Sequence, residues 1–443
     1  MTTKPRGSML LDIAGIIGSR GMLVVFGLGT GILTARILGP HDRGLFTLLL
    51  LLPQTLVAFT KMGVAQANVY QIRKREIPIE TVASNAFVLC LVLSAAMLLV
   101  CFAGGQSILA PFTKGAPPSF VWLVLLLIPF ILIESYFLSI LQAVEEFRAY
   151  TLQSVYKAIL GFGGVASALL LFHGGLWEAL LSQVLVLSAV NLWLLYRVRR
   201  VAPFGLHWTA DVGRSTLTFG LKSYLQTLAS HLHYRIGLYL VAYYLNPAEV
   251  AFYSIAINVT NPILHIPDAV GTVIFPKLAG SSAADAHQRT SVTCRHTVFA
   301  TMMASVLYVG LGSQLLPFFY GERYTPAITP MFMMLPGIIM ISMYQILTRN
   351  FTSRNRQQVN IFAASIALAI NCLLNVLLIP RFGIAGAAAS TAVSYTIAST
   401  ILLVAFVRES GASVRQTVMV GGADLAMYPR MLMAAGARLR GSS

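Results

Sequence analysis

The sequence predicts an all-α membrane protein with about twelve transmembrane helices, arranged as two six-helix lobes related by a pseudo-two-fold axis along the membrane normal. Three observations lead to this fold class. The 443-residue chain is 57% hydrophobic and only 10% charged, whereas soluble domains carry roughly 25% charged residues. Its apolar residues form runs that are each long enough to cross a hydrocarbon core of about 30 Å. Turn residues of the first half recur in the second half at a nearly constant spacing.

The apolar runs are separated by segments rich in glycine, proline or charge, where a transmembrane helix cannot continue. In the first half they predict six helices, at residues 10–33, 45–70, 82–102, 120–141, 152–172 and 176–196. Six more are expected at residues 217–244, 248–275, 292–316, 328–347, 359–379 and 384–407. The predicted domains are a cytoplasmic N-terminus (1–9), an N-terminal lobe (10–196), a cytoplasmic linker (197–216), a C-terminal lobe (217–407) and a cytoplasmic tail (408–443).

The basic residues are distributed unevenly between the two sides of the predicted membrane. Of the 31 lysines and arginines, 21 lie in the termini and in the loops on the same side. Because cytoplasmic loops carry the excess of lysine and arginine, both termini are predicted to be cytoplasmic. The net charge of +16 therefore indicates membrane topology, and no nucleic-acid partner is expected.

An internal repeat supports the two lobes. An offset of 207 or 208 residues aligns three places in the two halves: Leu38-Gly39-Pro40 with Leu245-Asn246-Pro247, Ile128-Pro129 with Leu335-Pro336, and Gly175-Leu176 with Gly383-Ile384. Single matches of this kind arise by chance, but three at nearly one offset favour a duplication. Since each half has an even number of helices, the halves are expected to share one orientation.

Polar residues inside the predicted helices are the candidate substrate-binding residues. A charge at the bilayer centre costs roughly 2.5–3.5 kcal/mol, so such residues are expected to face protein or water. On the second helix Gln54, Lys61 and Asn68 share one face, and on the eighth helix Asn261, His265 and Asp268 form a comparable stripe. The others are Arg20 in the first helix and Lys222, Gln226, His231 and Arg235 in the seventh.

The repeat places the opposite charges of Lys61 and Asp268 at equivalent positions, which predicts a gate between the lobes. A plainer interpretation of any intramembrane charge is a snorkelling side chain or a structural ion pair. We favour that interpretation for Lys157, Glu178 and Lys222, which lie near helix ends.

Neither a catalytic nor a metal site is predicted. Glu134 in the fourth helix is accompanied by no nucleophile and no paired carboxylate. The four cysteines lack metal-ligand spacing: Cys90, Cys101, Cys294 and Cys372. The chain is therefore expected to be neither an enzyme nor a cofactor-binding protein.

Several motifs carry a family resemblance: Ala35-Arg36-Ile37-Leu38-Gly39-Pro40, Gly63-Val64-Ala65-Gln66-Ala67-Asn68-Val69-Tyr70, Phe147-Arg148-Ala149-Tyr150 and Ile274-Phe275-Pro276-Lys277-Leu278-Ala279. With them the chain resembles the Wzx-type polysaccharide-biosynthesis flippases of the multidrug/oligosaccharidyl-lipid/polysaccharide (MOP) flippase superfamily. That superfamily also holds the lipid II flippase and the multidrug-and-toxin extruders (MATE). One departure is Gly237, which stands where similar proteins often carry an acidic residue, so an ion-coupling role is not carried over to that position.

The resemblance implies a MOP/MATE-like fold in a bacterial inner membrane. It also implies transport of an undecaprenyl-diphosphate-linked oligosaccharide, a repeat unit of cell-surface polysaccharide, from the cytoplasmic to the periplasmic leaflet by alternating access. Membrane lipid, a coupling ion (H⁺ or Na⁺) and other polysaccharide-assembly proteins are the further partners that it implies.

Two alternatives remain open at the level of the sequence. A MATE-like multidrug or cation antiporter would have an acidic and aromatic cleft. A membrane glycan polymerase or ligase would need a large periplasmic loop, and the longest one predicted here spans only residues 103–119.

Overall fold

The structure is a computed structural model that describes residues 6–421 and Asp424. Within this range it describes side chains except those at 6–20, 105–108, 110–112, 222–223, 225–227, 229–234, 276 and 279. The described residues form helices and connections between helices, without a strand. The chain divides into two compact units.

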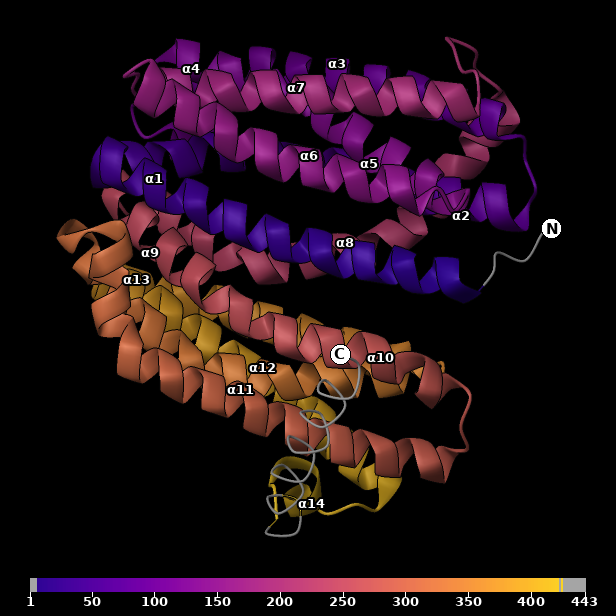
Figure 1. Cartoon of the computed structure of the whole chain (residues 1–443), viewed down its shortest axis with the longest axis vertical. Helices are drawn as coiled ribbons and strands as arrows, with labels where there is room; N and C mark the ends of the chain where they lie inside the picture. The colour runs from indigo at the N-terminus through magenta and orange to yellow at the C-terminus, as the bar shows by residue number, and fades with distance from the viewer. Residues whose placement is uncertain (1–5, 422–423, 425–443) are drawn as a thin grey trace, which may run out of the picture. The chain divides into compact units, whose positions relative to one another are not determined.

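The first unit comprises Met1–Val259, Leu315–Ile328 and Ile379–Ile384. Its helices are α1 (Arg6–Thr60), α2 (Val64–Lys74), α3 (Ile79–Thr113), α4 (Pro118–Leu125), α5 (Leu127–Ala143), α6 (Phe147–Ala166), the π-helix η1 (Ser167–Leu171), α7 (Leu176–Val201), α8 (Ala210–Tyr244), most of α9 (Pro247–Thr260) and the 3₁₀ helix η3 (Glu322–Ala327). In this unit α6 packs against α1 and α7, and α5 packs against α2, α3 and α7 (Figure 1).

The second unit comprises Thr260–Gln314, Thr329–Leu378 and Ala385–Ser443. It contains the 3₁₀ helix η2 (Asn261–Leu264), α10 (His265–Ala279), α14 (Val414–Val418) and most of α11 (Ala283–Tyr320), α12 (Ile328–Ser353) and α13 (Gln357–Ser410). Buried residues of α11, α12 and α13 form its hydrophobic core, with Phe351 and Phe406 among the largest.

Two of the helices each contain two predicted spans. Non-helical backbone divides α1 at Gly39 (φ 75°, ψ 174°) and α13 at Gly383 (φ 57°, ψ −139°). Glycine adopts positive φ without the penalty that a Cβ atom brings. Among the described residues, eight helices are long and apolar enough to cross a membrane. The predicted all-α, multi-span membrane fold is confirmed, and the count of twelve crossings stays a prediction.

Three predicted segments are wrong: two helices are interrupted, and one expected loop is mostly helical. The second helix was expected to be continuous over residues 45–70, but α1 ends at Thr60 and α2 begins at Val64. The eighth, expected at residues 248–275, is interrupted by η2, where Pro262 supplies no backbone N–H. The loop expected at residues 103–119 is helical up to Thr113. Apolar runs locate membrane segments, but they do not report where the backbone leaves the helical conformation within one.

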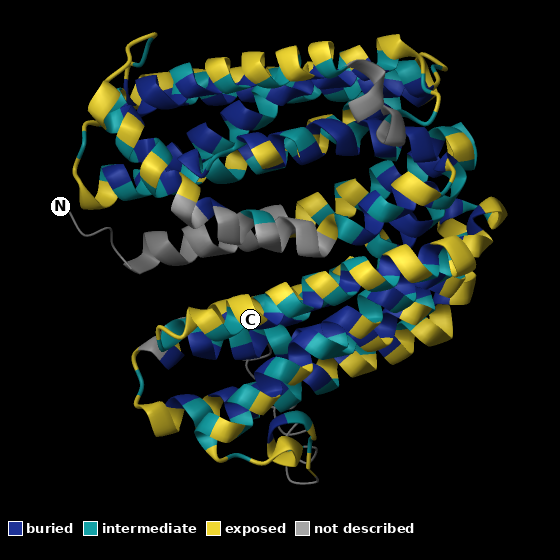
Figure 2. Cartoon of the chain, turned by 180° about the vertical axis from the view of Figure 1, so that it is seen from behind, coloured by how far each residue is buried: buried dark blue, intermediate teal, exposed yellow. Residues whose placement is uncertain are grey.

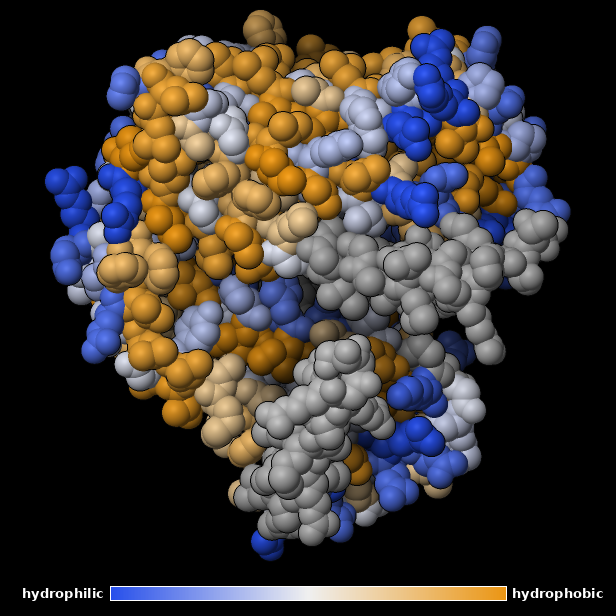
Figure 3. Space-filling model, in the orientation of Figure 1, coloured by the Kyte–Doolittle hydropathy of each residue, from blue (hydrophilic) through white to orange (hydrophobic). Residues whose placement is uncertain are grey.

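The outer surfaces of the helices are apolar. Many large hydrophobic side chains are exposed, including Leu99, Phe102, Phe172 and Leu185, and exposed residues follow the outer helix faces in Figure 2. On the face drawn in Figure 3, hydrophobic residues cover the middle of the helices and hydrophilic residues gather near their ends. Exposed apolar surface of this extent is unusual in soluble monomers and fits contact with lipid.

Candidate functional site

The candidate site is a cavity of about 530 Å³ inside the first unit. Five helices, α1, α2, α5, α6 and α7, and the connection between α1 and α2 form its walls. Its polar lining consists of Gln54, Lys61, Glu134, Ser135, Ser139, Gln142, Tyr150, Lys157 and Gln183. Its apolar lining consists of Leu50, Ala58, Ala65, Leu127, Ile131, Leu138, Val186 and Leu187. The volume lies within the roughly 300–1,000 Å³ of ordinary small-molecule sites.

Helix α5 supplies the longest wall of the cavity. Its lining residues include Leu127, Ile131, Glu134, Leu138 and Gln142, which recur at steps of three or four. Residues at this spacing lie on one face of an α-helix. The opposite face of α5 holds the fully buried Tyr136, Phe137 and Leu132, which pack in the core of the unit. The buried face therefore anchors the helix, and the lining face turns from apolar to polar toward its C-terminal end.

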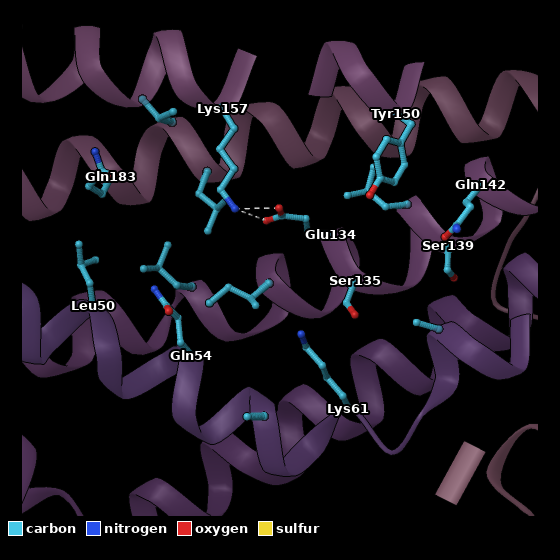
Figure 4. A pocket seen from close by; sticks show the side chains of 17 residues that line it. Leu50, Gln54, Lys61, Glu134, Ser135, Ser139, Gln142, Tyr150, Lys157 and Gln183 are labelled. Atoms are coloured by element: carbon cyan, nitrogen blue, oxygen red, sulfur yellow. Dashed lines mark hydrogen bonds and ion pairs between the residues drawn. The ribbon is translucent and has the colours of Figure 1, made fainter. Parts of the chain in front are cut away.

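Three charged side chains meet in this cavity. The Lys157 ammonium on α6 donates to both carboxylate oxygens of Glu134 on α5, at 2.7 and 2.9 Å. The Lys157 side chain is 43% exposed and that of Glu134 is 18% exposed. Lys61 points into the cavity toward Ser135 and Glu134 (Figure 4). No hydrogen bond or ion pair with another described residue reaches the Lys61 ammonium.

A break in the backbone carries Lys61 into this position. The chain leaves the helix after Thr60, passes through Met62 (φ 45°) and Gly63 (φ 70°), and resumes as α2. The carbonyl of Lys61 accepts hydrogen bonds from the Val64 N–H at 3.2 Å and from the buried Tyr136 hydroxyl at 3.1 Å. Non-helical backbone at membrane depth is tolerated where protein buries it or where it lines a cavity, and both conditions hold here.

Helix α8 packs directly on the break. A Cβ atom at Gly63 would lie 2.1 Å from the carbonyl oxygen of Gly220, and one at Gly220 would lie 2.5 Å from that of Met62. Beside this contact the rings of Tyr70 and Phe219 stack with centroids 4.2 Å apart. The two backbones approach this closely because neither glycine has a side chain.

The predicted polar face of the second helix is divided by the break. Gln54 and Lys61 line the cavity. Asn68 does not: it is 1% exposed, and its amide donates to the Tyr136 carbonyl oxygen at 3.3 Å and to the Ser139 hydroxyl at 3.2 Å. Asn68 therefore ties α2 to α5, on the far side of the break from Gln54.

The other predicted site residues lie elsewhere. Arg235 is exposed on α8 and is not part of the cavity lining. The structure places the stripe of the eighth helix in the second unit, where Asn261 and His265 are exposed and Asp268 Oδ1 lies 3.4 Å from Arg349 Nη2. A contact between Lys61 and Asp268 stays a prediction. The following predicted residues lie outside the described side chains: Arg20, Lys222, Gln226 and His231.

Sequence reasoning missed most of the polar lining, which α5, α6 and α7 supply. Of the three charges that we assigned to structural roles, Lys157 pairs with Glu134 and the Glu178 carboxylate accepts the N–H of Gly175 at the start of α7. Lys157 nevertheless lines the cavity. The missed signal was the spacing along residues 127–142, where polar residues recur on one helix face.

The cavity offers hydrogen-bonding groups to a ligand. Among the described residues, no hydrogen bond engages the side chains of Gln54, Gln142 or Tyr150. Amides and hydroxyls both donate and accept, which suits a ligand that is rich in hydroxyl groups. The described residues hold no group of three or more His, Cys, Asp or Glu placed to bind a metal ion.

Comparison with solved structures defines the class of the fold as that of MOP-superfamily transporters. The lipid II flippase MurJ in its inward closed conformation matches with a TM-score of 0.76 and 15% identity, over 90% of both chains. An inward-facing multidrug resistance MATE family transporter matches with a TM-score of 0.65 and 14% identity, over 88% of this chain and 94% of that one. A MOP superfamily transporter from Pyrococcus furiosus, whose binding pocket is described as having reverse polarity, matches with a TM-score of 0.59 and 14% identity over 93% and 99%.

The sequence identifies the family of the chain. Residues 33–329 match the model of the polysaccharide biosynthesis protein family, and the chain belongs to that family. A relative from Haloferax volcanii, the probable low-salt glycan biosynthesis flippase Agl15, is 24% identical over 193 residues. That alignment covers 43% of this chain and 41% of the relative, so it spans less than half of either protein.

Proposed function

We propose that this protein is a flippase that moves a lipid-linked oligosaccharide of polysaccharide biosynthesis across the membrane. Membership of the polysaccharide biosynthesis protein family supports a role in polysaccharide biosynthesis. The Haloferax relative is itself named a probable flippase. The likeness to the lipid II flippase supports a fold suited to this task. The finer proposal is that the carrier is undecaprenyl diphosphate and that transport runs from the cytoplasmic to the periplasmic leaflet of a bacterial inner membrane.

The cavity is the observation that carries the proposal. A polar cavity inside a helical membrane unit is costly unless a ligand or water compensates its polar groups. The side chains of Gln54, Gln142 and Tyr150, which no hydrogen bond from another described residue engages, match the hydroxyl groups of sugars. In transporters of this general design, movement of the lobes exposes such a site alternately to the two sides of the membrane. H⁺ or Na⁺ as coupling ion, and contacts with other polysaccharide-assembly proteins, belong to the same proposal.

The charge of the cavity favours a glycan over an organic cation. The described lining residues include two lysines and one glutamate, and Tyr150 is the one aromatic residue among them. A site for organic cations would be expected to carry excess negative charge and several aromatic faces. The polymerase or ligase alternative is disfavoured because the helical extension of α3 to Thr113 shortens the loop on which such an enzyme would depend.

Deletion of the gene in its host tests the proposed function. Surface polysaccharide should be lost, and a lipid-linked oligosaccharide should accumulate in the cytoplasmic leaflet, where inside-out vesicles expose it to a soluble glycosidase. Complementation with the wild-type gene should restore both. Unchanged surface polysaccharide, or an intermediate that already reaches the periplasmic leaflet in the deletion strain, contradicts the proposal.

The proposed orientation has a separate test by cysteine labelling. In a variant without the native cysteines, a cysteine at Ser119 should react with an impermeant maleimide in intact cells. A cysteine at Ser282 should react only after the membrane is opened. The opposite pattern would place both termini outside the cytoplasm and would contradict the proposed topology.

A further inference from the structure

We infer that the cavity of the first unit is a subsite for one carboxylate-bearing sugar of the transported oligosaccharide, and that Lys61 binds the carboxylate. The inference rests on the proposed flippase function and names the chemical class of its substrate. It starts from the arrangement of the three charges in the cavity.

The charges of the described lining residues do not cancel. Glu134 is engaged through both oxygens by Lys157, at 2.7 and 2.9 Å. Lys61 is left as a cation that has no hydrogen bond or ion pair with another described residue. An ammonium in a partly desolvated site is costly unless an anion compensates it. One negative charge supplied by a ligand would make the lining and its ligand neutral together.

The backbone break that directs the Lys61 side chain into the cavity costs regular helical hydrogen bonding. The break after Thr60 gives up regular helix, and Tyr136 on α5 donates its buried hydroxyl to the Lys61 carbonyl oxygen. A side chain that merely needed to reach the lipid interface would not require such a support. Figure 4 shows the result, with Lys61 directed toward the polar wall formed by α5.

Charge matching distinguishes a sugar carboxylate from the diphosphate of the lipid carrier. A diphosphate bears at least two negative charges and is best bound by several cations or by the forked donors of arginine. Among the residues whose side chains the structure describes, the lining contains no arginine, and its second lysine is occupied by Glu134. A carboxylate bears one charge, and the amides of Gln54 and Gln142 can serve the hydroxyl groups of the same sugar ring.

The test begins with the intermediate that accumulates when the gene is deleted. Mass spectrometry of the extracted lipid-linked oligosaccharide should show at least one sugar with a carboxylate. Part of the extract is then reduced with carbodiimide and borohydride, which converts each sugar carboxylic acid to an alcohol and leaves the diphosphate in place. Purified protein in proteoliposomes receives the acidic or the reduced substrate, and the initial rate of flipping is measured.

Wild-type protein should flip the acidic substrate at least about tenfold faster than the reduced one, the loss expected for one charge-assisted contact. Lys61→Gln should flip both at the same low rate, and Lys61→Arg should retain part of the preference. Lys74→Gln removes an exposed lysine outside the cavity and should behave as wild type. The preference between substrates is the decisive readout because a merely destabilised protein would lose activity on both equally.

Three results would overturn the inference while leaving the flippase function intact. These are an intermediate without a carboxylate, equal wild-type rates on the two substrates, or a Lys61→Gln variant that keeps the full preference. In the last case Lys61 serves the diphosphate or the fold. A wild-type protein that flips neither substrate would instead refute the proposed function on which the inference rests.

Discussion

Replacement of Gly63 by alanine should destabilise the first unit, because two separate effects act at this residue. Its φ of 70° lies in the left-handed region, where a residue with a Cβ atom costs about 1–2 kcal/mol. The new Cβ would also lie 2.1 Å from the Gly220 carbonyl oxygen, so α8 or the break must move. Overpacking of this kind typically costs about 1–3 kcal/mol. The sum predicts a loss of about 2–5 kcal/mol.

Other glycines of the chain separate the two effects. Gly115 has φ 82° but nothing within 4 Å of its added Cβ, so Gly115→Ala reports backbone strain alone. Gly220 has ordinary φ but a clash at 2.5 Å with the Met62 carbonyl oxygen, so Gly220→Ala reports the steric effect. Gly310 in α11 has neither problem, and alanine there should be neutral or slightly stabilising.

The measurement is equilibrium unfolding of the purified variants in mixed micelles, followed by tryptophan fluorescence. We expect Gly63→Ala to lose approximately the sum of the Gly115→Ala and Gly220→Ala losses. Flipping per folded molecule should also fall in Gly63→Ala, because the break directs Lys61 into the cavity. A Gly63→Ala protein within about 0.5 kcal/mol of wild type, the scale of ordinary surface changes, would refute the structural account of the break.

Further predictions concern contacts that hold the site and the C-terminal segment. Tyr136→Phe removes one of two hydrogen bonds to the Lys61 carbonyl oxygen, which should cost about 1 kcal/mol of unfolding free energy and lower the flipping rate. Lys157→Gln strands the Glu134 carboxylate, so it should destabilise more than the double variant with Glu134→Gln. The 43% exposure of Lys157 keeps this loss below the roughly 3–5 kcal/mol of fully buried pairs. Arg295→Ala removes the 2.8 Å contact to Asp424 and should speed proteolysis of the C-terminal segment in inside-out vesicles.

The first and last of these predictions have matched control variants, and the double variant serves as the comparison for Lys157→Gln. Tyr196→Phe removes an exposed hydroxyl and should leave stability and transport unchanged. Arg199→Ala removes an exposed guanidinium from the end of α7 and should not alter proteolysis of the C-terminal segment. A Tyr136→Phe variant equal to Tyr196→Phe, a double variant as unstable as Lys157→Gln alone, or unchanged proteolysis in Arg295→Ala would contradict the corresponding contact.

Sequence alone determined the class of the fold, because the length and apolar character of each run are local properties. The lipid bilayer, acting as the solvent, sets the length that such a run needs. A run of apolar residues long enough to cross the hydrocarbon core must be helical in lipid, whatever its neighbours are. Local sequence patterns also identified the turn at Gly39, where glycine precedes proline. They marked Gln54 and Lys61 as polar residues that lipid does not favour. The resemblance of short motifs to a flippase family agrees with the family to which residues 33–329 belong.

Only the tertiary structure decided which polar groups meet. Glu134 and Lys157 stand 23 residues apart on different helices, and their pairing depends on α5 lying beside α6. Asn68 looked like a continuation of the Lys61 stripe, but the break at Gly63 turns its amide toward α5. Helical periodicity assumes an unbroken helix, and the close approach of α8 at Gly220 that accompanies the break lies far away in the sequence. The local pattern marked Lys61 as a candidate, but which groups surround its side chain in the cavity depends on packing between helices.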